Sequence, residues 1–317
     1  MPTHFADRLV EAVTRKKSPL CVGYDPRWDA LPAVFRMSQG GPTAGSAPIA
    51  APDEYRLAGS YERFFWALTD VLAPIVPVVK PQVAFFEASG RMGLDVYRAV
   101  VAHARSKGLL VIADVKRGDI ASTAEAYAHA WLDDSSSPHF TGGYGPDAIT
   151  ASPYLGGDSL EPFFKTAEKH GKGVFVLVKT SNPGSADFQD LLVDGRPMYE
   201  HVAGRVDAWG ASRVGAEGLS LVGAVVGATH PGAAARLREL MPRAVLLLPG
   251  IGAQGASPAD VKACFLPGMK GALISASRHV IYAWTRSPYK ERYGEARWER
   301  ACEEAARDLT GEITSAI

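Results

Sequence analysis

The stretch LLVIADVKRGDI, residues 109–120, begins with an apolar run rich in branched residues and ends with four charged side chains. An apolar run of this kind is typical of a buried strand in a parallel sheet. The segment that follows, IASTAEAYAHAW at residues 120–131, has the spacing of a helix. The stretch therefore predicts a βα unit whose strand has charged side chains at its carboxyl end.

The same alternation recurs along the chain, where apolar runs are followed by turn residues and helical segments. Eight runs have the character of strands, at residues 19–25, 75–80, 109–116, 147–154, 173–181, 221–229, 244–252 and 271–278. Helices are expected between them, for example at 61–72 and 93–108, and also before the first run and near 290–316. Eight such units in 317 residues predict an α/β fold, a parallel eight-stranded (β/α)8 TIM barrel with an N-terminal helix. A doubly wound open sheet is the alternative, but no G-x-G-x-x-G motif follows the first strand.

We expect one barrel domain over residues 1–317, with three loop insertions. The Gly-, Ala-, Pro- and Ser-rich stretch at 37–52 is expected to be a mobile loop rather than a linker between domains. A polar insertion at 133–146 precedes the fourth strand, and residues 182–200 extend the loop after the fifth. The last insertion follows the carboxyl end of a strand, where barrel enzymes place their chemistry.

The composition argues against several classes of partner. Lys plus Arg and Asp plus Glu both total 34, so no overall basic field favours nucleic acid. The three cysteines, Cys21, Cys264 and Cys302, do not fit a disulfide framework, and they predict a reducing, cytoplasmic location. We find no apolar run of the roughly 18 residues that a membrane span needs, and the N-terminus lacks the apolar core of a signal peptide.

Charged residues recur where the first three strands end. Asp114 and Lys116 alternate with Val115, so they share one face of the third strand. If Val115 packs against the helices, both charges face the mouth of the barrel, where Lys80 and Asp25 end the second and first strands. A solvated rim of salt bridges explains any one of these residues; the group together favours a catalytic site.

Asp119 has two interpretations. It precedes the helical segment IASTAEAYAHAW and could be its N-cap. It also lies close enough along the chain to act with Lys116. Ile120 and Thr123 lie three residues apart on the first turn of that helix, and they could reach a neighbouring subunit as easily as their own site.

A phosphate site is predicted at the ends of the last two strands. Residues 248–258, LPGIGAQGASP, form a Gly-rich loop after the seventh strand, and Arg278 ends the eighth. Barrels often bind phosphate at this position through backbone N–H groups, to which Arg278 and the amide of Gln254 would add donors. A flexible turn beside a surface arginine is the structural alternative.

The remaining candidates are less specific. Ser181 ends the fifth strand without a Ser-His-Asp context, so hydrogen bonding is a better interpretation than nucleophilic attack. No two histidines have H-x-x-x-H spacing. Asp25, Asp114 and Asp147 leave a magnesium site formally possible.

On these residues, the chain resembles the orotidine 5'-monophosphate decarboxylase family, particularly its longer bacterial subgroup, over nearly its whole length. The motif D-x-K-x-x-D-I is formed by Asp114, Lys116, Asp119 and Ile120, with Thr123 following. It is joined by Lys80 in VVKPQVAFFE, by TSNPG at 180–184, by PGIGAQG at 249–255 and by Arg278.

The resemblance implies an enzyme that decarboxylates orotidine 5'-monophosphate to UMP and CO2 in de novo pyrimidine biosynthesis, without a metal ion or cofactor. The implied catalytic residues are Lys80, Asp114, Lys116, the proton donor to C6, and Asp119. The implied binding residues are Asp25 and Lys80 for the ribose, Ser181 for the pyrimidine, and Pro249, Gln254, Ser277 and Arg278 for the phosphate. A homodimer is also implied, in which Asp119, Ile120 and Thr123 complete the site of the other subunit.

One departure from the family and two alternative functions accompany this expectation. The chain has Ser-Ala-Ser before Arg278 where many relatives have Val-Gly, so Ser277 must offer its backbone N–H to phosphate in place of glycine. A magnesium-dependent phosphosugar decarboxylase or aldolase is possible on the same barrel. A non-catalytic nucleotide-binding regulator is the third possibility. The TSNPG and PGIGAQG segments favour the nucleotide enzyme, and the intact charged motif argues against a silent protein.

Overall fold

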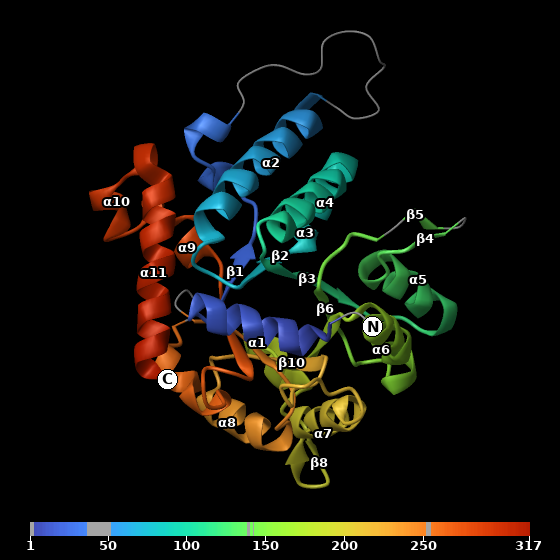
Figure 1. The fold of residues 1–317 in the computed structure, drawn as a ribbon. Coiled ribbons are helices and arrows are strands. Elements are labelled where there is room, and N and C mark those ends of the chain that lie inside the picture. Colours follow the sequence, from blue (N-terminus) through green and yellow to red (C-terminus); the bar gives the residue numbers. More distant parts are fainter. Residues whose placement is uncertain (1–2, 37–51, 138–139, 142, 252–254) are drawn as a thin grey trace.

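The eight predicted strands close into one parallel barrel in the computed structural model (Figure 1). The structure describes residues 3–36, 52–137, 140–141, 143–251 and 255–317. The barrel strands are β1 (Leu20–Tyr24), β2 (Val78–Pro81), β3 (Leu110–Arg117), β6 (Ala148–Ala151), β7 (Gly173–Lys179), β10 (Val222–Val226), β11 (Leu246–Pro249) and β12 (Ala272–Ala276). Each is bonded to its neighbour in chain order, and β12 pairs with β1 to complete the circle. The TIM-barrel prediction is therefore confirmed, and the open doubly wound sheet is wrong.

Helices surround the barrel and connect its strands. The longer ones are α1 (Phe5–Lys16), α2 (Pro52–Leu72), α4 (Gly90–Ser106), α5 (Ala121–Leu132), α6 (Gly157–His170), α7 (Met198–Gly210), α8 (Pro231–Leu240) and α11 (Trp298–Ala316). Three short ones are α3 (Val83–Glu87), α9 (Arg278–Ile281) and α10 (Tyr289–Arg292), and a 3-10 helix, η4 (Pro258–Cys264), follows β11. Among these described helices, none combines the length and apolar character needed to cross a membrane.

The side chains of the strands divide between two apolar clusters. On β3, Leu110 and Ile112 point into the barrel interior, whereas Val111 and Val115 pack in the layer between strands and helices. The prediction that Val115 packs against the helices is therefore confirmed. Because side chains alternate along a strand, Asp114 faces the barrel interior. Helix α1 closes the amino-terminal end of the barrel with Phe5 and its apolar neighbours, so the carboxyl ends of the strands form the open mouth.

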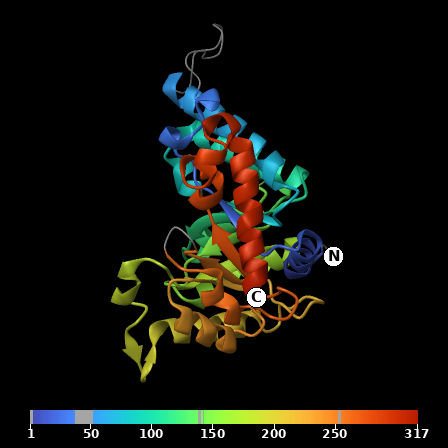
Figure 2. The same cartoon turned by 90° about the vertical axis from the view of Figure 1, so that its left-hand side faces the viewer.

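The insertions have different structures. Residues 133–146 include the short strands β4 (Ser136–Ser137) and β5 (Phe140–Thr141), and residues 182–200 include the 3-10 helix η3 (Pro183–Asp187) and the hairpin of β8 (Leu192–Val193) and β9 (Arg196–Pro197). In Figure 2 this second hairpin projects on the side of the barrel opposite α1. The predicted mobile loop at 37–52 lies, apart from Pro52, outside the described residues.

Candidate active site

Three charged side chains, Lys80, Asp114 and Lys116, meet at the mouth and are called the charged array below. Lys80 on β2 donates to Oδ2 of Asp114 at 2.7 Å, and Lys116 on β3 donates to Oδ1 at 2.5 Å. The carboxylate of Asp114 is therefore held between two ammonium groups. The predicted convergence of these three residues is confirmed.

Burial and charge act in opposite directions on the array. Burial lowers the pKa of Lys80, but the negative charges of Asp114 and Asp25 outweigh it and raise that pKa above its ordinary value. Burial likewise raises the pKa of Asp114, and the two lysines outweigh it and hold the pKa below its usual range. Both groups are thus ionised at neutral pH. The side chain of Lys116 is 47% exposed, which leaves its ammonium open toward the mouth.

A cavity of about 330 Å3 lies directly over the array. Small-molecule sites occupy about 300–1,000 Å3, so this volume suits a ligand of modest size. The lining residues are Lys80, Asp114, Lys116, Thr150, Leu177, Thr180, Ser181, Asn182, Val225, Leu247 and Pro249. The structure thus brings the predicted residues Ser181 and Pro249 to the same hollow as the charged array.

The loop after β7 is fixed by a buried lysine that sequence reasoning missed. Lys179 donates to Asp190 at 2.6 Å and to Ser185 at 3.1 Å, and its ammonium lies 5.5 Å from the ring centre of Tyr199. These contacts hold the segment that contains Ser181 against the end of the barrel. Lys179 precedes TSNPG directly, but nothing in the sequence distinguishes it from a solvated rim lysine.

The predicted phosphate residues follow two neighbouring strands. Pro249 of β11 pairs with Ser275 of β12, so the loops after these strands begin side by side. Gly250 has a φ of 110°, which glycine adopts without strain and which turns the chain away from the strand. Arg278 is exposed at the start of α9. Gln254 lies outside the described residues, so its predicted position is not described.

Ser277 is accommodated by a gap in β1. A Cβ atom built on Gly23 would lie 1.9 Å from Oγ of Ser277. The serine side chain therefore occupies space that exists because residue 23 is glycine. This packing gives a structural reason why a serine fits at this position.

Asp119, Ile120 and Thr123 do not reach the cavity. Asp119 is half-buried on the loop after β3, and its carboxylate accepts a hydrogen bond from the N–H of Ile120 at 2.8 Å. The N-cap of α5 is Ile120, without a side-chain cap, so the interpretation of Asp119 as the N-cap of this helix is wrong. Ile120 and Thr123 are exposed. None of the three lines the described cavity of its own subunit.

The aspartates considered for magnesium do not form one group. Asp147 precedes β6 at the amino-terminal end of the barrel, where it pairs with Arg8 at 2.7 Å. Asp25 follows β1 and Asp114 lies in the carboxyl-terminal half of β3, so both are at the opposite end of the barrel. Within the described ranges, no set of three or more His, Cys, Asp and Glu residues is placed to hold a metal ion.

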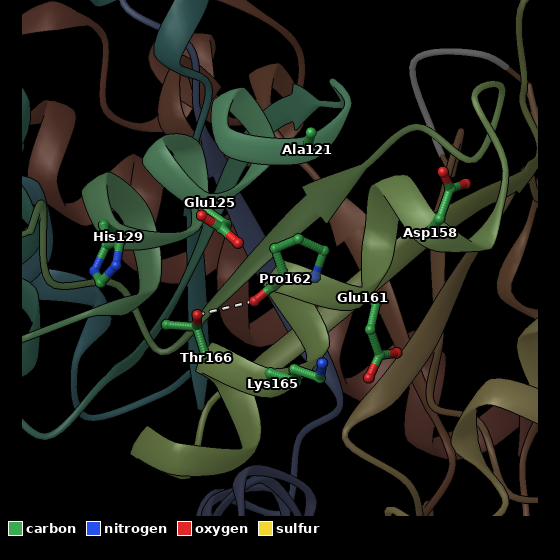
Figure 3. A pocket seen from close by; sticks show the side chains of 8 residues that line it. All are labelled: Ala121, Glu125, His129, Asp158, Glu161, Pro162, Lys165 and Thr166. Atoms are coloured by element: carbon green, nitrogen blue, oxygen red, sulfur yellow. Dashed lines mark hydrogen bonds between the residues drawn. The ribbon is translucent and has the colours of Figure 1, made fainter.

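A second hollow, of about 510 Å3, lies between α5 and α6 on the outside of the barrel (Figure 3). Glu125, Asp158 and Glu161 give it carboxylates, and the hydroxyl of Thr166 donates to the carbonyl of Pro162 at 2.9 Å. Its lining begins at Ala121, next to the exposed Ile120. This hollow therefore belongs to the outer face beside the mouth.

A closed parallel barrel with an ionised array at the carboxyl ends of its strands defines a (β/α)8-barrel enzyme. The comparisons make this assignment specific, because the sequence model of the Orotidine 5'-phosphate decarboxylase / HUMPS family matches residues 18–286, and the chain belongs to that family.

Individual relatives agree with the family model. A protein of Rhodopirellula baltica named orotidine 5'-phosphate decarboxylase is 42% identical, and the alignment covers 98% of each chain. A protein of the same name from Deinococcus radiodurans is 40% identical over 89% of this chain and 91% of its own. The structure of Leishmania donovani OMP decarboxylase superposes with a TM-score of 0.73 at 34% identity, over 99% of this chain and 98% of the other. These likenesses extend over almost the entire barrel.

Proposed function

We propose that the protein decarboxylates orotidine 5'-monophosphate to UMP and CO2, without a metal ion or cofactor, as a step of pyrimidine biosynthesis. The observation that carries the proposal is the charged array at the base of the mouth cavity. Loss of CO2 from this substrate leaves a carbanion at C6 of the pyrimidine, whose ring offers no electron sink. Fixed charges beside C6 are the means by which a protein can stabilise such a carbanion.

Lys116 has the role of proton donor in this proposal. Its ammonium is exposed toward the cavity and held by Asp114, so it can stabilise negative charge on C6 and then deliver a proton there. Asp114 faces the departing carboxylate; two unit charges about 4 Å apart repel by about 4 kcal/mol at an effective dielectric constant of about 20. Departure of neutral CO2 relieves that repulsion.

The remaining residues bind the nucleotide. Asp25 and Lys80 are assigned to the ribose hydroxyls and Ser181 to the pyrimidine. At the phosphate, backbone N–H groups near Pro249 and Ser277 act with the side chains of Gln254 and Arg278. The adjacent loops after β11 and β12 support this subsite, since backbone N–H groups and an arginine suit a phosphate dianion.

A homodimer would complete the site, with Asp119, Ile120 and Thr123 acting on the cavity of the partner subunit. The loops after β3 and β6 lie together, joined by the bond from the N–H of Ser152 to the carbonyl of Arg117 at 2.9 Å. Large apolar side chains are exposed on these loops, with Ile120 57%, Tyr154 85% and Leu155 47% accessible. An exposed group of this kind at a functional rim is typical of a protein interface.

The test is the ultraviolet absorbance of orotidine 5'-monophosphate mixed with the purified protein in excess EDTA. The proposal predicts a conversion to the UMP spectrum at a rate that EDTA does not change. An unchanged spectrum with correctly folded protein would reject it. Turnover of phosphosugars that appears only when magnesium is restored would instead establish a magnesium-dependent phosphosugar decarboxylase or aldolase.

A further inference from the structure

The pairing of β3 with β6 is irregular at the charged array. Ala113 pairs with Ile149 and Arg117 pairs with Ala151, so four steps along β3 correspond to two along β6. Asp114, Val115 and Lys116 therefore lie opposite the single residue Thr150. Bulges of this kind bend a strand and re-aim its side chains, and they deprive backbone N–H groups of their usual partners.

The hydroxyl of Thr150 replaces those missing partners. Its oxygen accepts the N–H of Val115 and the N–H of Lys116, each at 3.0 Å, and its proton is donated to Oδ1 of Asp114, also at 3.0 Å. A hydroxyl offers one donor and two acceptor positions, and here all three are used. Thr150 is 1% exposed, so these bonds are shielded from water.

The backbone of Lys116 shows why this support matters. Its φ is 46°, in the left-handed region that residues other than glycine seldom occupy. Such a conformation persists where the surroundings determine it. The bond from the N–H of Lys116 to Thr150 fixes the peptide at this point, while the same oxygen atom is tied to Asp114.

We propose that Thr150 is a positioning residue for the decarboxylation, which holds Lys116 and Asp114 at a fixed separation beside the reacting carbon. The inference rests on the proposed function, because it assigns Thr150 to the step that Lys116 and Asp114 perform. Thr150 lines the cavity from β6, on the side of Asp114 opposite Lys80 on β2. A displaced catalytic group can cost about a hundredfold in rate, so the bulge requires this support.

The experiment measures kcat and KM for orotidine 5'-monophosphate in Thr150→Val and Thr150→Ser, with UMP binding measured alongside. Thr150→Val keeps the side-chain shape and removes all three bonds, and Thr150→Ser keeps the hydroxyl. Thr69→Val is the matched control. Thr69 lies in α2, does not line the cavity, and is also fully buried. Its hydroxyl donates to the carbonyl of Phe65 and contacts the hydroxyl of Tyr24 on β1.

We expect Thr150→Val to lower kcat by about tenfold to a hundredfold with KM changed by less than about threefold, and Thr150→Ser to recover kcat to within about threefold of wild type. Thr69→Val should lower the melting temperature and leave kcat unchanged.

Wild-type turnover in folded Thr150→Val, or equal losses of kcat in the serine and valine variants, would overturn the inference. If Thr150→Val does not fold, a tenfold or larger loss of kcat in folded Thr150→Ser would overturn the inference. An inactive wild-type protein would instead refute the proposed function and remove the inference with it.

Discussion

Lys80 and Asp114 form a buried ion pair at the mouth of the barrel, with 2.7 Å between Nζ and Oδ2 and side chains only 9% and 10% exposed. Taking two charges out of water costs free energy that their attraction often fails to recover. The pair therefore contributes little net stability. Its effect is to hold the Asp114 carboxylate in the position where it also binds Lys116. The ion pair places fixed charges of both signs beside the cavity.

The pKa of Asp114 predicts how its contribution to stability depends on pH. The folded-state pKa lies below the ordinary value of about 3.9, so the folded protein binds this proton more weakly than the unfolded chain. The stabilisation is fully present above about pH 5 and is lost as the pH falls below about 4, toward the folded pKa.

Asp114→Asn removes this titration and leaves Lys80 buried without its carboxylate. We expect the free energy of unfolding to fall by about 3 kcal/mol at pH 7, and the difference from wild type to shrink below about pH 4. Urea denaturation between pH 3 and 7 checks this, with the exposed Asp95→Asn as the control. A difference that stays constant over that range would contradict the account.

Sharing of sites between subunits can be tested by complementation. Lys116→Ala and Asp119→Ala should each give an inactive homodimer. A mixed dimer would carry both defects in one site and none in the other, so purified mixed dimers should have about half of wild-type activity. Activity of co-expressed, doubly tagged dimers measures this. If purified mixed dimers remain inactive, Asp119 acts in its own subunit or has no role in the site.

Arg278→Ala tests whether phosphate binding contributes to the chemical step. Binding energy far from the broken bond can lower the barrier when it orders the loops and excludes water. We expect kcat to fall and KM to rise, each by at least about tenfold. Steady-state kinetics measure both constants, with Arg300→Ala on the exposed face of α11 as the control. A change in KM alone would refute this coupling.

The fold could be predicted because its signals are local. Each of the eight apolar runs overlaps one barrel strand, and the alternation around Val115 gave the correct face for Asp114. Gly108, expected to end a helix, has a φ of 77° just after α4. These features depend on neighbouring residues along the chain, which is the information that a single sequence contains.

The support of the site could not be predicted because it depends on pairing between distant segments. Thr150 lies in an apolar run and resembles any β-branched strand residue until the bulge in β3 places three residues opposite it. Lys179 acquires its role only when residues 185 and 190 fold back onto it. For Asp119, the pattern suggested an N-cap, but the helix starts later and the carboxylate binds the adjacent N–H instead.

The central claim is that Lys116 stabilises the carbanion and delivers the proton to C6. Its most direct test is the turnover of orotidine 5'-monophosphate by Lys116→Ala in EDTA, followed by ultraviolet absorbance. The control is Lys270→Ala, whose ammonium pairs with Glu217 before β12, at the other end of the barrel. The account predicts a loss in kcat of at least about 1,000-fold for Lys116→Ala, with UMP still bound and Lys270→Ala fully active. A Lys116→Ala enzyme that keeps a tenth or more of wild-type turnover would contradict it.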